Sequence, residues 1–231
     1  MRAKFIQYIS KMTAPNIHFI SLNPDWTEVM KDLFASYKNV KITEGNIRSI
    51  PMKDAAFVSP ANSLGFMDGG IDYVLSRRMF PGIQTAVQLR IAAAGHRSPL
   101  GRSFLPIASA VWIPTPSVPS CGLIVAPTMF QPHDVSGTQN AYWSFLASLV
   151  LHSKVSPDKK LVVTSHCCGY GKMPADVSAE QMFRAYEDFM AGRVPDDSGD
   201  PDSVELPGVE ESQPKNHDNR EFKNIAVSDV F

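Results

Sequence analysis

Residues 58–72 read Val-Ser-Pro-Ala-Asn-Ser-Leu-Gly-Phe-Met-Asp-Gly-Gly-Ile-Asp, the most informative stretch of the chain. A β-type run ends in Ala-Asn-Ser, a glycine-rich loop follows at residues 65–70, and a helix opens at Asp72. Glycines let a backbone approach a ligand closely and turn its N–H groups toward it. The following helix adds unpaired N–H groups and the positive end of its dipole. We therefore expect this first glycine loop to hold a phosphate or diphosphate, with Asn62 and Asp72 within reach of an attached sugar.

Strand-like and helix-like segments alternate along the rest of the chain. Buried strands are predicted at 17–22, 123–126 and 161–164, short strands at 40–42 and 55–58, and a looser strand at 103–113. Helices are predicted at 24–34, 71–79, 83–95, 138–152 and 178–190. This alternation is typical of an α/β fold whose largely parallel sheet is covered on both faces. In such sheets, ligands bind beyond the carboxyl ends of the strands.

A second glycine loop, residues 169–174, follows the last predicted strand. Because both glycine loops come directly after strands, we expect them to converge at the same sheet edge. The helix after the second loop is predicted to open at Ser178, where Ser-x-x-Gln to Gln181 reads as a capping box.

Length and composition indicate one well-buried domain. The chain has 231 residues, 44% of them hydrophobic, and no apolar run approaches the 18 residues of a membrane span. Residues 1–16 carry three basic residues and no acid, and are predicted to be an N-terminal arm, with a mitochondrial presequence as the competing interpretation. The domain is placed at 17–192. Residues 193–231 are predicted to be an acidic, disordered tail, since they are rich in Pro, Asp, Ser and Glu.

The charge distribution and the cysteine content limit the kinds of ligand, metal site and compartment that we expect for this chain. Residues 196–231 hold ten acidic and three basic residues, a net charge of −7, so the preceding part carries +6 against the total of −1. That balance suits an anionic small ligand and does not indicate nucleic acid binding. The three cysteines, Cys121, Cys167 and Cys168, have neither disulfide-framework nor metal-site spacing. We expect a reducing compartment, cytoplasmic or nuclear, no metal, no cofactor and a monomer.

The chain resembles the macro domain family, the ADP-ribose-binding α/β/α module, over roughly residues 17–190. The spacing of ten residues from Asn62 to Asp72 is the specific part, and it resembles the pair in MacroD-type ADP-ribosyl hydrolases. Further resembling elements are Gly45-Asn46-Ile47, Ala61-Asn62-Ser63, Gly69-Gly70-Ile71-Asp72, Pro127-Thr128-Met129, Asp134-Val135-Ser136-Gly137-Thr138, Asn140-Ala141-Tyr142 and Gly169-Tyr170-Gly171. Three of these elements, at 127–129, 134–138 and 140–142, are similar to a branch associated with ADP-ribose-phosphate processing.

The resemblance implies a three-layer α/β/α sandwich with a mixed, largely parallel sheet and a site for ADP-ribose or an ADP-ribosylated protein. It implies catalytic roles for Asn62, which would fix the distal ribose, and Asp72, which would activate water. The implied ligand-binding residues are Asn46, Ile47, Ala61, Asn62, Gly69, Gly70, Ile71, Gly169, Tyr170, Gly171 and Lys172. Three functions stay open: a mono-ADP-ribosyl hydrolase, a non-catalytic ADP-ribose reader, and an ADP-ribose 1″-phosphate phosphatase.

Two features depart from the family pattern. Asn46 stands where the family has an acid beside the adenine amine, so that hydrogen bond would lack charge assistance. The second glycine loop is shorter than usual, and Tyr170 replaces a small residue there.

Several residues also have a purely structural interpretation. Asn62 can close a strand, Asp72 can complement a helix dipole, and Asp68 is expected to point away from a diphosphate. Tyr170 is either a ribose contact or a packed loop aromatic. His166-Cys167-Cys168 does not predict a nucleophilic pair, since neighbouring strand residues face opposite sides.

Overall fold

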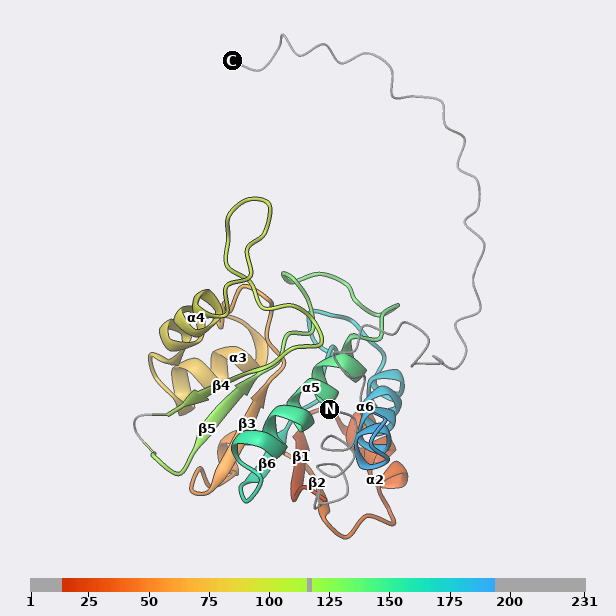
Figure 1. Cartoon of the computed structure of the whole chain (residues 1–231). Coiled ribbons are helices and arrows are strands. Elements are labelled where there is room, and N and C mark those ends of the chain that lie inside the picture. The colour runs from red at the N-terminus through yellow and green to blue at the C-terminus, as the bar shows by residue number, and fades with distance from the viewer. Residues whose placement is uncertain (1–13, 116–117, 194–231) are drawn as a thin grey trace, which may run out of the picture. The chain divides into compact units, whose positions relative to one another are not determined.

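The computed structural model describes residues 14–115 and 118–193 (Figure 1). Its centre is a six-stranded sheet with the order β2-β1-β6-β3-β5-β4. The strands are β1 (Ile17–Ser21), β2 (Val40–Glu44), β3 (Ala55–Ser59), β4 (Val111–Pro114), β5 (Gly122–Val125) and β6 (Lys160–Val163). All neighbouring strands pair in parallel except β4, which is antiparallel to β5 at one edge. The predicted mixed, largely parallel sheet is therefore confirmed.

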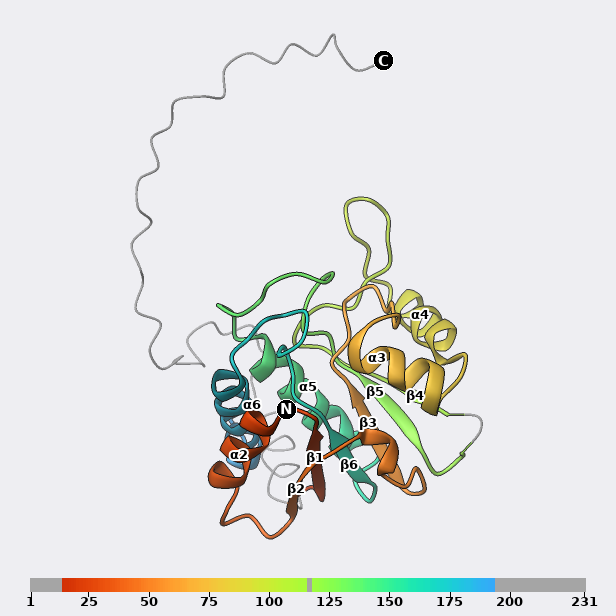
Figure 2. The same ribbon diagram turned by 180° about the vertical axis from the view of Figure 1, so that it is seen from behind.

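Helices cover both faces of this sheet, as the front and back views show (Figures 1 and 2). One layer holds α2 (Pro24–Leu33), α5 (Asn140–Val155) and α6 (Ala175–Met190), and the other holds α3 (Gly70–Val74) and α4 (Ile83–Ala93). Two short turns complete the set: the 3₁₀ turn η1 (Ile47–Ser49) and the π-helical turn η2 (Leu75–Met79), which continues α3. The three-layer α/β/α sandwich is confirmed.

Side-chain alternation along the strands builds two separate cores. In β3, Ala56 and Val58 face the α2–α5–α6 layer, while Phe57 faces the α3–α4 layer. The same alternation places Phe19 of β1 with the first layer and Ile20 with the second. Because successive side chains of a strand point to opposite faces, a sheet buried on both sides needs apolar residues at nearly every position. The continuous apolar runs in the sequence have this cause.

The start of α2 matches its prediction. The Asn23 side chain accepts a hydrogen bond from the Trp26 backbone N–H at 3.2 Å, and Pro24 occupies the first helical position. Both features lower the free energy of a helix N-terminus, since one unpaired N–H is satisfied and φ is already helical.

The predicted start of α6 at Ser178 is wrong. The helix begins at Ala175, and Ser178 lies inside it, where its buried hydroxyl donates to the His166 backbone oxygen at 2.7 Å. Gln181, the other half of the expected capping box, accepts from the Tyr142 backbone N–H and donates to the Thr138 carbonyl. Tertiary hydrogen bonds take both side chains away from the local motif.

The loose strand predicted at 103–113 is also corrected. Only its end forms a strand, β4, while residues 95–104 form a loop that projects from the end of α4 (Figure 1). Residues 1–13 and 194–231, which include most of the predicted arm and tail, lie outside the described residues. None of the described helices is both long and apolar enough to cross a membrane.

Candidate functional site

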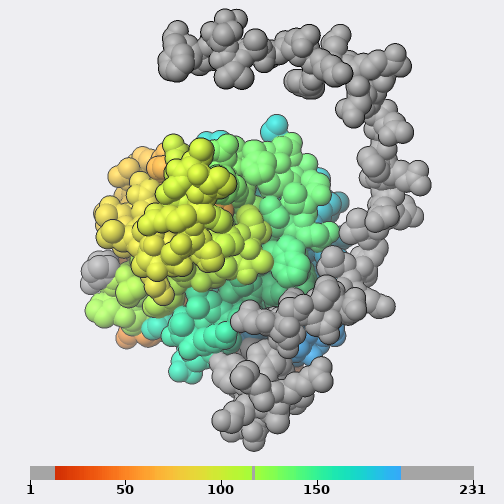
Figure 3. All heavy atoms as spheres, turned by 45° about the horizontal axis from the view of Figure 1, so that its top comes forward, coloured from red at the N-terminus to blue at the C-terminus, as the bar shows by residue number. Residues whose placement is uncertain are grey.

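A cavity of about 350 Å³ opens at the carboxyl edge of the sheet, between the two glycine loops. Figure 3 tilts this edge toward the viewer and shows the segments around residue 100 (yellow) and residue 130 (green) beside each other on the surface. Residues from both loops and from the ends of β3 and β5 line it: Pro60, Ala61, Asn62, Phe66, Asp68, Gly69, Gly70, Ile71, Asp72, Thr128, Met129, Pro132, Ser165, Cys167, Gly169, Tyr170 and Gly171. We call this space the main cavity. The predicted convergence of the loops is what creates it.

Tyr170 physically joins the two loops. A Cβ built on Gly69 would lie 3.0 Å from the Tyr170 ring, so the aromatic side chain of the second loop rests on the bare backbone of the first. Tyr170 is nevertheless 65% exposed. Gly70 has a φ of 53°, which favours glycine, and no atom lies within 4 Å of its missing Cβ.

Most of the hydrogen-bonding groups of the Asn62 side chain are engaged with the backbone of the first loop. Its Oδ1 accepts from the backbone N–H groups of Leu64 at 3.1 Å and Phe66 at 3.2 Å, and its Nδ2 donates to the Phe66 carbonyl at 2.6 Å. An amide nitrogen carries two N–H donors, so one remains for a ligand in the main cavity. The two interpretations of Asn62 therefore coexist, since the side chain both shapes the loop and lines the cavity.

The second loop is a tight turn closed by its own backbone. The Lys172 N–H donates to the Gly169 carbonyl at 3.0 Å, and the Met173 N–H donates to the Cys167 carbonyl at 3.1 Å. A Cβ on Gly171 would lie 2.5 Å from the Cys167 carbonyl oxygen and 2.7 Å from the Val135 side chain. Only glycine fits at position 171 without moving the backbone.

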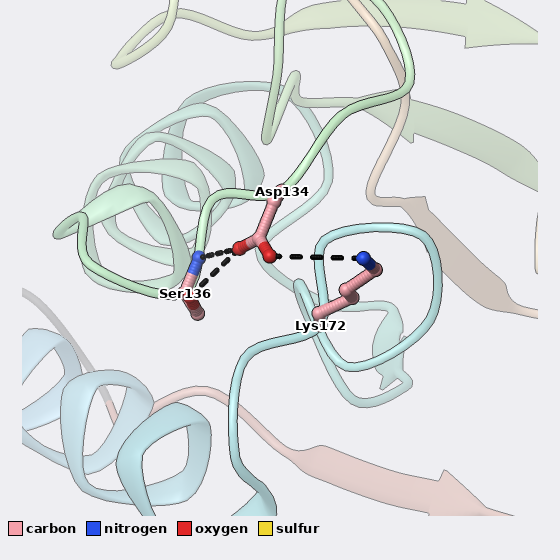
Figure 4. Close-up of polar contacts among 3 residues, drawn as sticks. All are labelled: Asp134, Ser136 and Lys172. Carbon is pink, nitrogen blue, oxygen red and sulfur yellow. Dashed lines mark hydrogen bonds and ion pairs between the residues drawn. The ribbon is translucent and has the colours of Figure 1, made fainter.

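Lys172 does not line the main cavity. Its Nζ lies 3.9 Å from Asp134 Oδ2, and the two side chains point toward each other from separate loops (Figure 4). The other carboxylate oxygen of Asp134 accepts hydrogen bonds from the Ser136 hydroxyl and backbone N–H, which lower the pKa of that carboxyl. Among the described residues, no lysine or arginine lines the cavity, so backbone N–H groups are the main donors that this part of the chain offers to an anion there.

Asp72 is a buried carboxylate in the wall of the main cavity. It is only 8% exposed, and the Ser59 hydroxyl donates to its Oδ1 at 2.5 Å. Burial raises the pKa of Asp72 to about 7, the hydrogen bond from Ser59 lowers it, and the nearby charge of Asp68 raises it further. A carboxyl group with such a pKa can take up and release a proton near neutral pH.

A second cavity of about 240 Å³ adjoins the main one and shares Gly70 and Ile71 with it. Asn46 and Ile47 lie on its other side, and we call it the side cavity. Asn46 is exposed and caps η1, where its Oδ1 accepts from the Arg48 backbone N–H at 3.0 Å. Its amide N–H₂ is therefore freer than its oxygen to meet a ligand.

His166 and Cys167 are buried, and Cys168 is partly buried. Burial lowers the pKa of His166 to about 3 and raises that of Cys167 to about 12, so the imidazole is neutral and the thiol protonated at neutral pH. Neither His166 ring nitrogen has a hydrogen-bond partner within the described part of the chain. No group of three His, Cys, Asp or Glu side chains suited to a metal ion occurs in residues 14–115 and 118–193.

Two buried groups are expected to oppose each other in the pH dependence of stability. Between about pH 4 and 6.5, Asp72 binds a proton only in the folded state, and His166 binds one only in the unfolded state. Lowering the pH therefore stabilises the fold through Asp72 and destabilises it through His166, each by about 1.4 kcal/mol per pH unit. In wild type these two slopes cancel.

Single substitutions separate the two contributions. The free energy of unfolding of each variant is measured in urea at pH 5 and at pH 6.5. In Asp72→Asn, stability should fall by about 2 kcal/mol toward pH 5, relative to wild type, and in His166→Phe it should rise by about as much. Parallel pH profiles for the three proteins would contradict both assignments.

Several residues of the site are not singled out by any sequence pattern. They include Ser59 and Phe66, as well as Pro132 and Ser165 in the wall. Ser59 carries one usable signal: it lies two residues after Phe57 in the same strand, and so faces the layer where α3 begins.

Among the comparisons with known proteins, the solved structures are the ones that support the fold. No protein-family model matches the chain. An uncharacterised protein of Aquifex aeolicus is 26% identical over 151 residues, which are 65% of this chain and 82% of that one. The macrodomain of Mycobacterium tuberculosis DarG is similar in structure, with a TM-score of 0.51 and 16% identity, over 63% of this chain and 88% of that one.

A second solved structure, a variant of the Oceanobacillus iheyensis macrodomain with ADPR, has a TM-score of 0.50 and 14% identity. It covers 63% of this chain and 75% of that one. At such identities the likeness is one of architecture. The chain has the macrodomain fold, as its resemblance to that family implied.

Proposed function

We propose that this chain, built on the macrodomain fold, binds ADP-ribose and removes mono-ADP-ribose from acidic side chains of modified proteins. The observation that carries the proposal is a single cavity walled by both glycine loops, with a buried carboxylate in the wall. The diphosphate would lie against the backbone N–H groups of the two loops. The adenosine would extend over Gly70 and Ile71 into the side cavity, and the distal ribose would lie beside Asn62 and Asp72.

The dimensions of the site suit such a ligand. The two adjoining cavities measure about 350 and 240 Å³, and taken together they lie within the range of about 300–1,000 Å³ that small-molecule sites span. The resemblance at Asn62 and Asp72 and the similarity to a macrodomain with ADPR both support this ligand.

Asp72 has the properties of a general base. In the proposed reaction, the oxygen of a water molecule bonds to the anomeric carbon of the distal ribose while the bond from that carbon to the target carboxylate breaks. Ionised Asp72 accepts the proton of the water, and the released carboxylate and free ADP-ribose are the products. Because its pKa is raised to about 7, turnover should increase as the pH rises through neutrality.

A non-catalytic reader is the second candidate, favoured by one observation. Asn62 has already used its oxygen and one N–H group within the first loop, which leaves a single donor to orient the ribose. Binding would then be retained without the precise placement that turnover needs.

Two assays on the full chain separate the candidates. Calorimetry with ADP-ribose measures binding, and release of ADP-ribose from mono-ADP-ribosylated protein measures turnover. Binding with turnover supports the hydrolase, and binding alone supports the reader. Release of inorganic phosphate from ADP-ribose 1″-phosphate would indicate the phosphatase, and absence of binding at millimolar ADP-ribose would contradict all three.

A further inference from the structure

A buried hydroxyl group from the sheet contacts the Asp72 carboxylate. Ser59 is the last residue of β3, its side chain is fully buried, and its hydroxyl donates to Asp72 Oδ1 at 2.5 Å. Distances of about 2.5–2.7 Å are typical of O–H···O⁻ bonds strengthened by charge. Among the described residues, no group hydrogen bonds the other carboxylate oxygen, Oδ2. The hydroxyl thus holds the carboxylate by one oxygen and leaves the second available to the main cavity.

Ser59 itself is not placed to react. It is absent from the residues that line the main cavity, so a substrate there would not contact its hydroxyl. Its backbone is fixed by the sheet: it pairs with Val125 of β5, and its carbonyl accepts from the Ala126 N–H at 3.0 Å. A donor on the last residue of a central strand is a rigid support for a side chain at the start of a helix.

The other ionisable groups described around the cavity do not support the Asp72 carboxylate in the way that Ser59 does. Asp68 in the first loop disfavours the charge on Asp72, and the remaining titratable residues of the wall are Cys167, just before the second loop, and Tyr170, within it. Lys172 is directed to Asp134. Ser59 is therefore the hydrogen-bonding partner that favours ionised Asp72 within the described part of the chain.

We propose that Ser59 is the positioning residue for Asp72, fixing the orientation of its carboxylate and favouring its ionised form. Its consequence for turnover rests on the proposed function, but the pairing itself does not. Loss of the hydroxyl should leave a carboxylate that ionises at higher pH and points less uniformly into the cavity.

The first measurement follows the Asp72 carboxyl carbon by NMR as the pH is changed, in full-length wild type and Ser59→Ala. We expect its titration midpoint to rise by about one pH unit in Ser59→Ala, as loss of a hydrogen bond to a charged group predicts. Ser59→Cys, of similar shape but a weaker donor, should give an intermediate midpoint. Unchanged midpoints in folded variants would overturn the proposal, whether or not the protein turns over any substrate.

The second measurement is the pH profile of turnover on mono-ADP-ribosylated protein. In Ser59→Ala the acid limb should move up with the NMR midpoint, lowering kcat about tenfold at pH 6 with little change in KM, and Ser59→Cys should recover part of the loss. Ser148→Ala is the matched control, because it removes another fully buried hydroxyl, which bonds within α5. A shift in Ser148→Ala as large as in Ser59→Ala would contradict a specific role for Ser59.

The proposed pairing of Ser59 with Asp72 and the proposed hydrolase function can fail independently. The informative case is a protein that shows the shifted NMR midpoint in Ser59→Ala but no turnover. That result would retain the Ser59–Asp72 pairing and reject the hydrolase.

Discussion

Asp72→Asn should lower turnover of mono-ADP-ribosylated protein by about 10²–10⁴-fold at pH 8, the usual cost of losing a positioned general base. The amide keeps the size of the carboxylate and can still accept the hydrogen bond from Ser59, so the wall of the main cavity should keep its shape. Single-turnover release of ADP-ribose measures the chemical step directly. Equal rates in wild type and Asp72→Asn would remove Asp72 from the mechanism.

A neighbouring carboxylate provides the matched control. Asp68→Asn makes the same chemical change in the same cavity wall, at an exposed position in the first glycine loop. It should leave turnover at pH 8 within a few-fold of wild type. Because the charge of Asp68 raises the pKa of Asp72, this variant should also extend activity toward lower pH.

The effect of Asp72→Asn should be on turnover and not on binding. Its ADP-ribose affinity, measured by calorimetry, should stay within a few-fold of wild type.

Gly171→Ala should weaken ADP-ribose binding by about 30–100-fold, which corresponds to about 2–3 kcal/mol. The new Cβ would lie 2.5 Å from the Cys167 carbonyl oxygen, so the second loop must move its backbone to admit a methyl group. Such overpacking typically costs about 1–3 kcal/mol of stability as well. Calorimetry gives the affinity, and urea unfolding gives the stability.

Gly169→Ala tests whether the effect is specific to the clash. No atom lies within 4 Å of a Cβ built on Gly169, in the same loop, so its stability should stay within about 0.5 kcal/mol of wild type. A Gly171→Ala variant as stable as Gly169→Ala would show that the second loop tolerates side chains, contrary to the geometry described above.

Much of the fold could be predicted from the sequence, because the relevant signals are local. The apolar runs of the strands, the Asn23–Pro24 helix start and the order of elements all depend on near neighbours in the chain. The meeting of the two glycine loops was also predictable, since both follow parallel strands and parallel strands end at one edge. Tyr170 resting on Gly69 is its direct result.

The wrong predictions concern side chains for which distant residues compete. Ser178 and Gln181 form a plausible local cap, but their hydrogen bonds go to His166, Tyr142 and Thr138. The contact of Lys172 with Asp134, 38 positions away in sequence, has the same origin, while the predicted contact of Lys172 with the ligand stays a prediction. Such partners are decided by tertiary packing, and a local pattern carries no information about them.

The most direct test of a ligand site shared by both loops is an NMR titration of the full chain with ADP-ribose, following backbone amides. We expect the amides of residues 65–70 and 169–171 to shift together and saturate at one ligand concentration, because both loops would contact one diphosphate. Shifts confined to a single loop, or to neither loop at millimolar ADP-ribose, would contradict a shared site.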